Sequence, residues 1–358
     1  MKNKKKAILF SVLVGAFLLS ACGGGRQLQA SSWPGITVKD DTIYVAYQKQ
    51  VISVQANNGT ELNRIPKETE NSTPDVFAPP VFLDENSMLL STYNNSFLNV
   101  NPVTGTENWT FLNQNRFIAS PLVTEDAIFL ANADHTMYAL DHSGNKLWTF
   151  MADDPLWAKP AFDGEKLYLG SMDHHLYAID PKNGSEIWAS DLGGTTVGTP
   201  AIGEDGTLYI GTFESEVYAI DSQSGEIQWR FPTKGWVWAG PTLSGDTLYV
   251  TDLAGYLYAV DSASGEALWN FKGDGAAPGA PLVLDSGIYF TTGGGTLYAM
   301  NMDGGVRWSQ TVEGKDVELF SPAASAGDLI IVGVVNADQL LIAYTTDGVK
   351  QWEYIPGK

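Results

Sequence analysis

A short motif, Gly-x-x-x-Trp, recurs along the chain at intervals of about 40 residues. Its glycines are Gly59, Gly105, Gly144, Gly184, Gly225, Gly265, Gly304 and Gly348. The tryptophans follow four positions later in all copies but the first, which has Asn63, and they are Trp109, Trp148, Trp188, Trp229, Trp269, Trp308 and Trp352. A unit of this length cannot bury its own apolar face, so neighbouring copies must stack. The repeat therefore constrains the fold more than any other feature.

Each copy predicts four short strands. A proline opens each copy, at Pro34, Pro80, Pro121, Pro160, Pro200, Pro241, Pro281 and Pro322. Two strands with alternating apolar residues follow, clearest at 167–170 and 176–180, and the last strand carries the Trp. No helical pattern interrupts them. Four strands per copy and eight copies predict an all-β, eight-bladed β-propeller with four antiparallel strands per blade, over residues 33–358.

The repeated residues have mechanical explanations. We expect the Gly to adopt positive φ in the turn between the third and fourth strands. Aspartates end the third strand in the middle copies, at Asp141, Asp180, Asp221 and Asp261. Their carboxylates can accept backbone N–H groups of that turn. The Trp is large enough to reach the next blade, where its indole N–H needs an acceptor. These columns are expected to hold the ring together rather than to carry function.

The N-terminus predicts export and lipidation. Residues 1–21 combine a basic start with an apolar run that is short for a transmembrane helix, as in a signal peptide. The sequence Leu19-Ser20-Ala21-Cys22 resembles the bacterial lipobox, which implies a diacylglycerol on Cys22 and a glycine-rich tether over residues 22–32. The alternative is an ordinary secretory signal with an incidental cysteine. The expected location is extracytoplasmic: the periplasmic side of the outer membrane in a diderm, or the outer face of the cell membrane in a monoderm.

The charge balance argues against nucleic-acid binding. The chain of 358 residues has a net charge of −20, which repels a phosphate backbone. Hydrophobic residues at 44% and charged residues at 17% suit a globular body. Cys22 is the only cysteine, so no disulfide can form within the chain.

The segment Ala178–Trp188, like Ala219–Trp229 and Ala259–Trp269, resembles the tryptophan-docking repeat of the pyrroloquinoline-quinone (PQQ) propellers. One branch of that family consists of longer dehydrogenases with PQQ, a metal, an Asp base and commonly a vicinal Cys pair. That pair is impossible here. The other branch contains non-catalytic lipoproteins of this size, among them the B subunits of the outer-membrane β-barrel assembly machinery.

The resemblance implies a membrane-anchored, non-enzymatic scaffold without a cofactor, binding an envelope protein partner as a monomeric propeller within a complex, with a role in outer-membrane protein assembly. Two alternatives remain open. One is a PQQ-dependent oxidoreductase. The other is a sensor of small ligands or glycans, which rests only on the aromatic residues.

Candidate partner-binding residues are those at which the copies differ. Trp157 and Trp238 lie three residues before a blade-opening Pro, in a column that reads Phe77, Ile118, Val197, Pro278 and Leu319 elsewhere. Phe320 and Trp236 are further candidates, and Trp236 is expected to be the most exposed. This column is expected near one mouth of the central channel, as either a buried apolar ring or an aromatic binding patch.

Lys159 is the only charged residue in the column just before the Pro. It is either a receptor for an anion or an ordinary surface lysine. Residues 64–77 form the one insertion relative to the repeat. This segment is polar and is either a recognition loop or a connection without a function of its own.

Four histidines, His135, His142, His174 and His175, lie in predicted turns. Histidines are common metal ligands, so a metal site is one interpretation. The turns are expected to lie too far apart for one ion, and solvated turn residues are the favoured interpretation.

Overall fold

A computed structural model describes residues 33–69 and 73–357. The expected signal peptide, the lipidated Cys22 and the tether lie outside these residues. The described part consists of strands and turns, without a helix. Its strands form eight separate four-stranded antiparallel sheets, which are the blades.

The first four blades contain sixteen strands. Blade 1 holds β1 (Gly35–Lys39), β2 (Thr42–Tyr47), β3 (Gln50–Gln55) and β4 (Glu61–Ile65). Blade 2 holds β5 (Val81–Asp84), β6 (Ser87–Ser91), β7 (Ser96–Val100) and β8 (Glu107–Leu112). Blade 3 holds β9 (Leu122–Val123), β10 (Ile128–Ala131), β11 (Thr136–Leu140) and β12 (Lys146–Met151). Blade 4 holds β13 (Ala161–Phe162), β14 (Leu167–Gly170), β15 (His175–Ile179) and β16 (Glu186–Asp191).

The remaining strands follow the same order. Blade 5 holds β17 (Ala201–Ile202), β18 (Thr207–Gly211), β19 (Glu216–Asp221) and β20 (Ile227–Pro232). Blade 6 holds β21 (Thr242–Ser244), β22 (Thr247–Thr251), β23 (Tyr256–Asp261) and β24 (Ala267–Lys272). Blade 7 holds β25 (Leu282–Leu284), β26 (Gly287–Thr291), β27 (Thr296–Met300) and β28 (Val306–Thr311). Blade 8 holds β29 (Ala324–Ala326), β30 (Leu329–Gly333), β31 (Leu341–Thr345) and β32 (Lys350–Tyr354).

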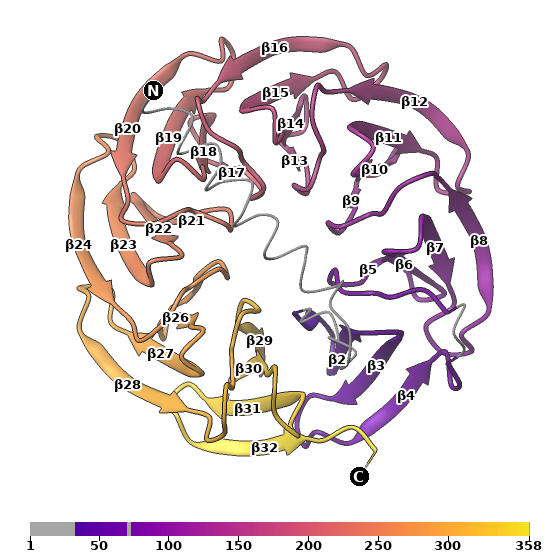
Figure 1. Cartoon of the computed structure of the whole chain (residues 1–358), viewed down its shortest axis with the longest axis vertical. Coiled ribbons are helices and arrows are strands. Elements are labelled where there is room, and N and C mark those ends of the chain that lie inside the picture. The colour runs from indigo at the N-terminus through magenta and orange to yellow at the C-terminus, as the bar shows by residue number, and fades with distance from the viewer. Residues whose placement is uncertain (1–32, 70–72, 358) are drawn as a thin grey trace, which may run out of the picture. The chain divides into compact units, whose positions relative to one another are not determined.

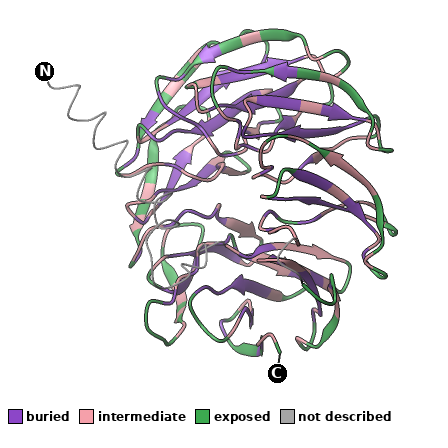
Figure 2. Cartoon of the chain, turned by 45° about the vertical axis from the view of Figure 1, so that its right-hand side comes forward, coloured by how far each residue is buried: buried purple, intermediate pink, exposed green. Residues whose placement is uncertain are grey.

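The blades are arranged as a ring, with the first strand of each nearest the axis and the last at the rim (Figure 1). We call these strands A to D. The predicted eight-bladed propeller is confirmed. Burial follows the same radial order: the two middle strands are mostly buried, and exposed residues concentrate in the D strands and turns (Figure 2).

The core lies between neighbouring blades rather than within one. One cluster joins Phe129 and Met137 of blade 3 to Leu169 and Ile179 of blade 4, and each of these side chains is at most 1% exposed. Packing of sheet against sheet therefore provides the burial that a single repeat lacks.

The Trp column fastens each D strand to the next blade, as predicted. The indole N–H of Trp148 donates to the carbonyl of Pro181 at 3.0 Å, and that of Trp188 to Ser222 at 3.1 Å. The other five make the same contact, in the pairs Trp109–His142, Trp229–Ser262, Trp269–Met302, Trp308–Thr346 and Trp352–Ala56.

Asn63 performs this role in the first copy, where Trp is missing. Its side-chain amide donates to the carbonyls of Pro102 at 3.3 Å and Val103 at 2.8 Å, in the turn of blade 2 that a Trp would reach. The interblade contact is thus preserved with a smaller donor.

Two structural constraints require glycine at these turn positions, and the sequence revealed only the first. Gly184 has a φ of 74°, as the motif predicts. In addition, the ring of Trp148 lies so close that a Cβ on Gly184 would be 2.4 Å from it. The predicted aspartate contacts are also present, since the Asp221 carboxylate accepts the N–H groups of Gln223 and Ser224 at 2.9 and 2.8 Å.

Candidate functional site

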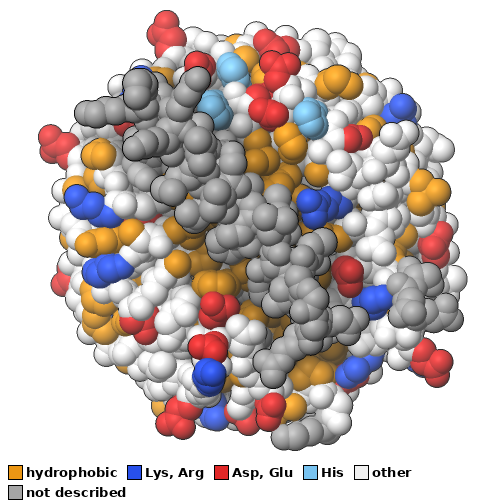
Figure 3. Space-filling view, in the orientation of Figure 1, with side chains coloured by type: hydrophobic (Ala, Val, Ile, Leu, Met, Phe, Trp, Pro, Cys, Tyr) orange, Lys and Arg blue, Asp and Glu red, His pale blue; other side chains and the backbone are white. Residues whose placement is uncertain are grey.

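One face of the ring carries every predicted partner-binding residue. It is built from the segments that join strand D of one blade to strand A of the next, here called D–A segments, and from the hairpin turns between strands B and C. The conserved Gly turns lie on the opposite face, because strand direction alternates within a blade. Figure 3 views the ring from the D–A side, where hydrophobic side chains gather around the centre.

Seven D–A segments share a backbone hydrogen bond to the B–C turn of the preceding blade. The N–H of Leu156 donates to the carbonyl of Asn132 at 3.3 Å, and that of Val237 to Thr212 at 3.1 Å. The donors are all buried residues, namely Val76, Phe117, Leu156, Thr196, Val237, Ala277 and Leu319. A mostly apolar buried ring is therefore present, but one position earlier than the column of Trp157 and Trp238, where the sequence placed it.

This hydrogen bond also changes the alignment of the last copy. Leu319 donates to Thr292 at 3.1 Å, so it is equivalent to Val237 and not to Trp238. The equivalent of Trp238 in blade 8 is Phe320, since this D–A segment is one residue shorter before its Pro. The residues at this level, here called the axial ring, are Phe77, Ile118, Trp157, Val197, Trp238, Pro278 and Phe320. All except Pro278 are partly exposed.

Five aromatic side chains from four segments form what we call the aromatic cluster: Trp33, Phe213, Trp236, Trp238 and Phe320. Phe213 stacks on Trp236 and on Trp238, with ring centroids 5.2 Å apart in both pairs. Trp33 packs edge-on against Trp238 at 5.5 Å and against Phe320 at 5.7 Å. Such pairs contribute about 0.5–1.5 kcal/mol each beyond burial.

The aromatic cluster brings together three of the five predicted residues: Trp236, Trp238 and Phe320. Trp33 lies just ahead of blade 1. It contacts Trp238, in the D–A segment that leads into blade 6, and Phe320, in the segment that leads into blade 8. Phe213 was missed by sequence analysis. It is the second residue of a B–C turn, after a polar residue, and the only other aromatic residue at this position in the described copies is Tyr93. Exposure does not single out Trp236, because Trp33, Trp157 and Trp238 are also partly buried.

Trp157 and Lys159 lie apart from these ring contacts. Along residues 156–160 buried and partly exposed positions alternate, and Trp157 and Lys159 are the two partly exposed residues. Burial lowers the pKa of the Lys159 ammonium. The indole N–H of Trp157 is buried and has no hydrogen-bond acceptor within the described part of the chain.

The most buried acidic side chains of this face are engaged within the fold. Asp252 is fully buried, and one carboxylate oxygen accepts the N–H groups of Lys234 and Gly235 at 3.1 and 2.8 Å and the hydroxyl of Tyr258 at 2.8 Å. Desolvation of the Tyr258 hydroxyl and its bond to Asp252 are among the effects that raise the tyrosine pKa. The acid therefore binds a B–C turn to the neighbouring D–A segment.

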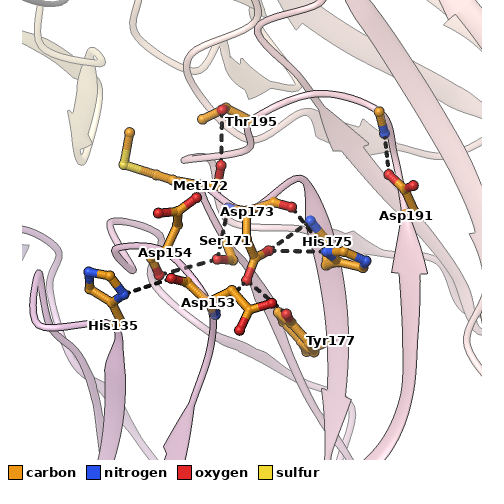
Figure 4. Close-up of polar contacts among 11 residues, drawn as sticks. His135, Asp153, Asp154, Ser171, Met172, Asp173, His175, Tyr177, Asp191 and Thr195 are labelled. Atoms are coloured by element: carbon orange, nitrogen blue, oxygen red, sulfur yellow. Dashed lines mark hydrogen bonds and ion pairs between the residues drawn. The ribbon is translucent and has the colours of Figure 1, made fainter.

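Asp173 repeats this arrangement in blade 4 (Figure 4). Its carboxylate accepts the N–H of Asp153 at 3.0 Å and the hydroxyl of Tyr177 at 2.8 Å. Burial raises the pKa of Asp173, but these hydrogen bonds and that from the His175 N–H outweigh it and lower the pKa below its ordinary value. The charge is thus stabilised by structure and is poorly suited to accept a proton near neutral pH.

His135, His142 and His174 occupy turns, as expected, whereas His175 is the first residue of β15. His135 donates from Nδ1 to the carbonyl of Asp153 at 2.8 Å, and His142 contacts the carbonyl of Thr124 on the opposite face at 3.1 Å. His135 and His174 have φ values of 71° and 78°. Among residues 33–69 and 73–357, no group of three or more His, Cys, Asp or Glu side chains could hold a metal ion.

The insertion at residues 64–77 is partly regular structure. Arg64 and Ile65 belong to β4, and Val76 pairs with Thr92 in an isolated bridge. Residues 70–72 lie outside the described part. Within that part no helix is long and apolar enough to cross a membrane.

The ring of four-stranded blades joined by docked tryptophans defines the class of PQQ-type eight-bladed β-propellers. A family model described as outer membrane protein assembly factor BamB matches residues 20–115, 48–214, 172–283 and 254–356. The chain belongs to this family.

Two solved structures are similar in fold. BamB from Moraxella catarrhalis has 18% sequence identity and a TM-score of 0.70, covering 88% of this chain and 94% of that one. The computationally designed Ika8 protein has 12% identity and a TM-score of 0.73, covering 90% of this chain and 96% of that one. A search of curated proteins gives no significant match.

Proposed function

We propose that the chain is a non-catalytic scaffold, anchored by a lipid on Cys22, that binds an envelope protein through the D–A face and acts in outer-membrane protein assembly. The observation that carries the proposal is the aromatic cluster. Partly exposed aromatic side chains that gather on one face are the composition of protein interfaces rather than of ordinary surface. Membership of the BamB family supports the assembly role.

The rest of the D–A face favours binding over catalysis. Its buried acids accept hydrogen bonds from tyrosines and backbone, as at Asp252 and Asp173. Such carboxylates hold turns in place, and a general acid or base needs a group free to exchange a proton. The face thus offers rigid loops and aromatic surface to a partner.

Site-specific crosslinking in native membranes tests the proposed interface. A photoreactive amino acid at position 236 is expected to capture one envelope protein in high yield. The matched control at position 165 lies in an exposed A–B turn on the opposite face and should capture none of it. Equal capture at both positions would exclude the D–A face as the interface.

Mass spectrometry of the mature protein tests the anchor. We expect a diacylglycerol-modified Cys22 at the N-terminus, and release of the Cys22→Ser variant from membranes. A mature N-terminus at another residue would refute the anchor while leaving the interface untouched.

A further inference from the structure

The D–A segment that leads into blade 4 differs from the others in carrying two unsatisfied donors. The residue before the blade-opening Pro is Trp33, Pro79, Ser120, Lys159, Thr199, Gly240, Ala280 or Ser321, here called the inner column. Lys159 alone is charged. Its position is near the ring axis, because a D–A segment runs from the rim to the innermost strand.

Two serines of the inner column are satisfied by the neighbouring blade. Ser120 donates to the carbonyl of Pro79 at 2.7 Å, and Ser321 donates to that of Pro34 at 2.7 Å. Lys159 has neither a hydrogen bond nor an ion pair with any described residue. Burial lowers its pKa, which reflects the cost of holding this charge with reduced hydration.

Trp157 adds a second donor of the same kind. Its indole N–H is buried without an acceptor, which costs about 1–3 kcal/mol. Two donors without acceptors, two residues apart in one segment, favour an anionic ligand.

No described acid forms an ion pair with Lys159, and the more buried acids of this face are engaged elsewhere. Asp173 is bonded to Tyr177 and the Asp153 N–H, Asp252 to Tyr258, and Asp134 to Tyr138 and Asn113. A cation left unpaired in a protein with a net charge of −20 therefore complements a negative group from outside the chain.

We propose that Lys159 and Trp157 form a carboxylate-binding site, which takes an acidic, aromatic-containing segment of the protein partner. This rests on the proposed scaffold function and specifies the chemistry of its partner. The ammonium of Lys159 pairs with one carboxylate oxygen, and rotation of the Trp157 side chain would expose its buried N–H to the other oxygen. Apolar residues of the segment pack on the axial ring and the aromatic cluster.

Titration of the full-length protein in detergent with synthetic peptides, followed by calorimetry, tests the site. The probe is a short peptide of alternating Phe and Asp with blocked ends. The matched probe replaces Asp by Asn, and a third is the Phe–Asn peptide with a free C-terminal carboxylate. We expect the acidic probe to bind about ten-fold or more tightly than the blocked Asn probe. Binding of the third probe through Lys159 would place the carboxylate at a chain end.

The variant Lys159→Met keeps the apolar stem of the side chain and is expected to abolish this preference for a carboxylate. The control Lys234→Met removes an exposed lysine from another D–A segment and should bind like wild type. Equal affinity of wild type and Lys159→Met for the acidic probe, with both folded by urea unfolding, would overturn the proposal.

Crosslinking separates this outcome from failure of the scaffold function itself. If wild type captures no partner, the scaffold function fails. If wild type and Lys159→Met capture the same partner equally, only the carboxylate site fails.

Discussion

The indole N–H of Trp352 donates a hydrogen bond of 2.9 Å to the backbone carbonyl of Ala56, 296 residues earlier in the chain. This contact joins blade 8 to blade 1. Each blade is built from four consecutive strands, so among residues 33–69 and 73–357 no strand from one end of the chain completes the blade at the other end. Closure therefore depends on side chains, and the bond from Ser321 to Pro34 is its counterpart near the axis.

The first prediction concerns this seam. Trp352→Phe keeps an aromatic side chain but removes the indole N–H that donates to Ala56. This substitution should lower the free energy of unfolding by about 1 kcal/mol. Hydrogen exchange of β1 and β32 should become faster, because local opening starts where closure is weakest. The control Trp188→Phe removes the same bond inside the ring and should leave β1 and β32 protected. Unchanged exchange in Trp352→Phe would contradict a seam held by this contact.

A second prediction separates backbone strain from Trp contact in the turns. Gly184 has positive φ and touches Trp148, whereas Gly245 has positive φ with open space around its Cα. Gly245→Ala should cost about 1–2 kcal/mol from the left-handed backbone alone. Gly184→Ala should cost clearly more, because the ring of Trp148 must also move. Urea unfolding measures both, and equal losses would mean that Trp148 adjusts freely.

The eight-bladed ring was predictable because its determinants are local and repeated. Proline, glycine and tryptophan recur in register, so each copy confirmed the others. The D–A face was harder to predict because it is made where copies differ. The aromatic cluster depends on rings from distant D–A segments, and Phe213 comes from a B–C turn that carries no repeated aromatic. The D–A segment before blade 8 is one residue shorter than its counterparts between the hydrogen-bond donor and the Pro, so counting back from its Pro aligned Leu319, instead of Phe320, with Trp238. The backbone hydrogen bond from Leu319 to Thr292 gives the correct alignment.

A third prediction tests the buried acid of blade 6. Asp252→Asn keeps the size of the side chain but replaces one acceptor oxygen by an amide. Oδ2 accepts from Lys234, Gly235 and Tyr258, so loss of its acceptor capacity should cost about 1–3 kcal/mol. The D–A segment carrying Trp236 and Trp238 should become mobile, with altered tryptophan fluorescence. An unchanged emission spectrum and stability would show that Asp252 does not position this segment.

The last prediction uses the polar contacts at the rim of the seam. Tyr354 of blade 8 donates to the carboxylate of Glu61 in blade 1, and Arg64 contacts both. The side-chain hydrogen bond from Arg64 is the largest effect on Glu61 and lowers its pKa from 4.5. Burial, followed by the bond to Glu61, raises the pKa of Tyr354 from 10.0 to about 12.

Both shifts mean that the charged carboxylate and the neutral phenol favour the folded ring. The Glu61 contribution is present above pH 4.5 and is lost as pH falls through its lower folded value. The Tyr354 contribution is present below pH 10 and is lost as pH rises towards about 12. Wild type should therefore exceed Tyr354→Phe in unfolding free energy by about 1 kcal/mol at neutral pH, with the difference shrinking at both limits. Tyr44→Phe, which removes a hydroxyl that has no hydrogen bond to a carboxylate among the described residues, is the control. A difference between wild type and Tyr354→Phe that stays constant from pH 4 to pH 11, in urea unfolding at each pH, would contradict the contact between Tyr354 and Glu61.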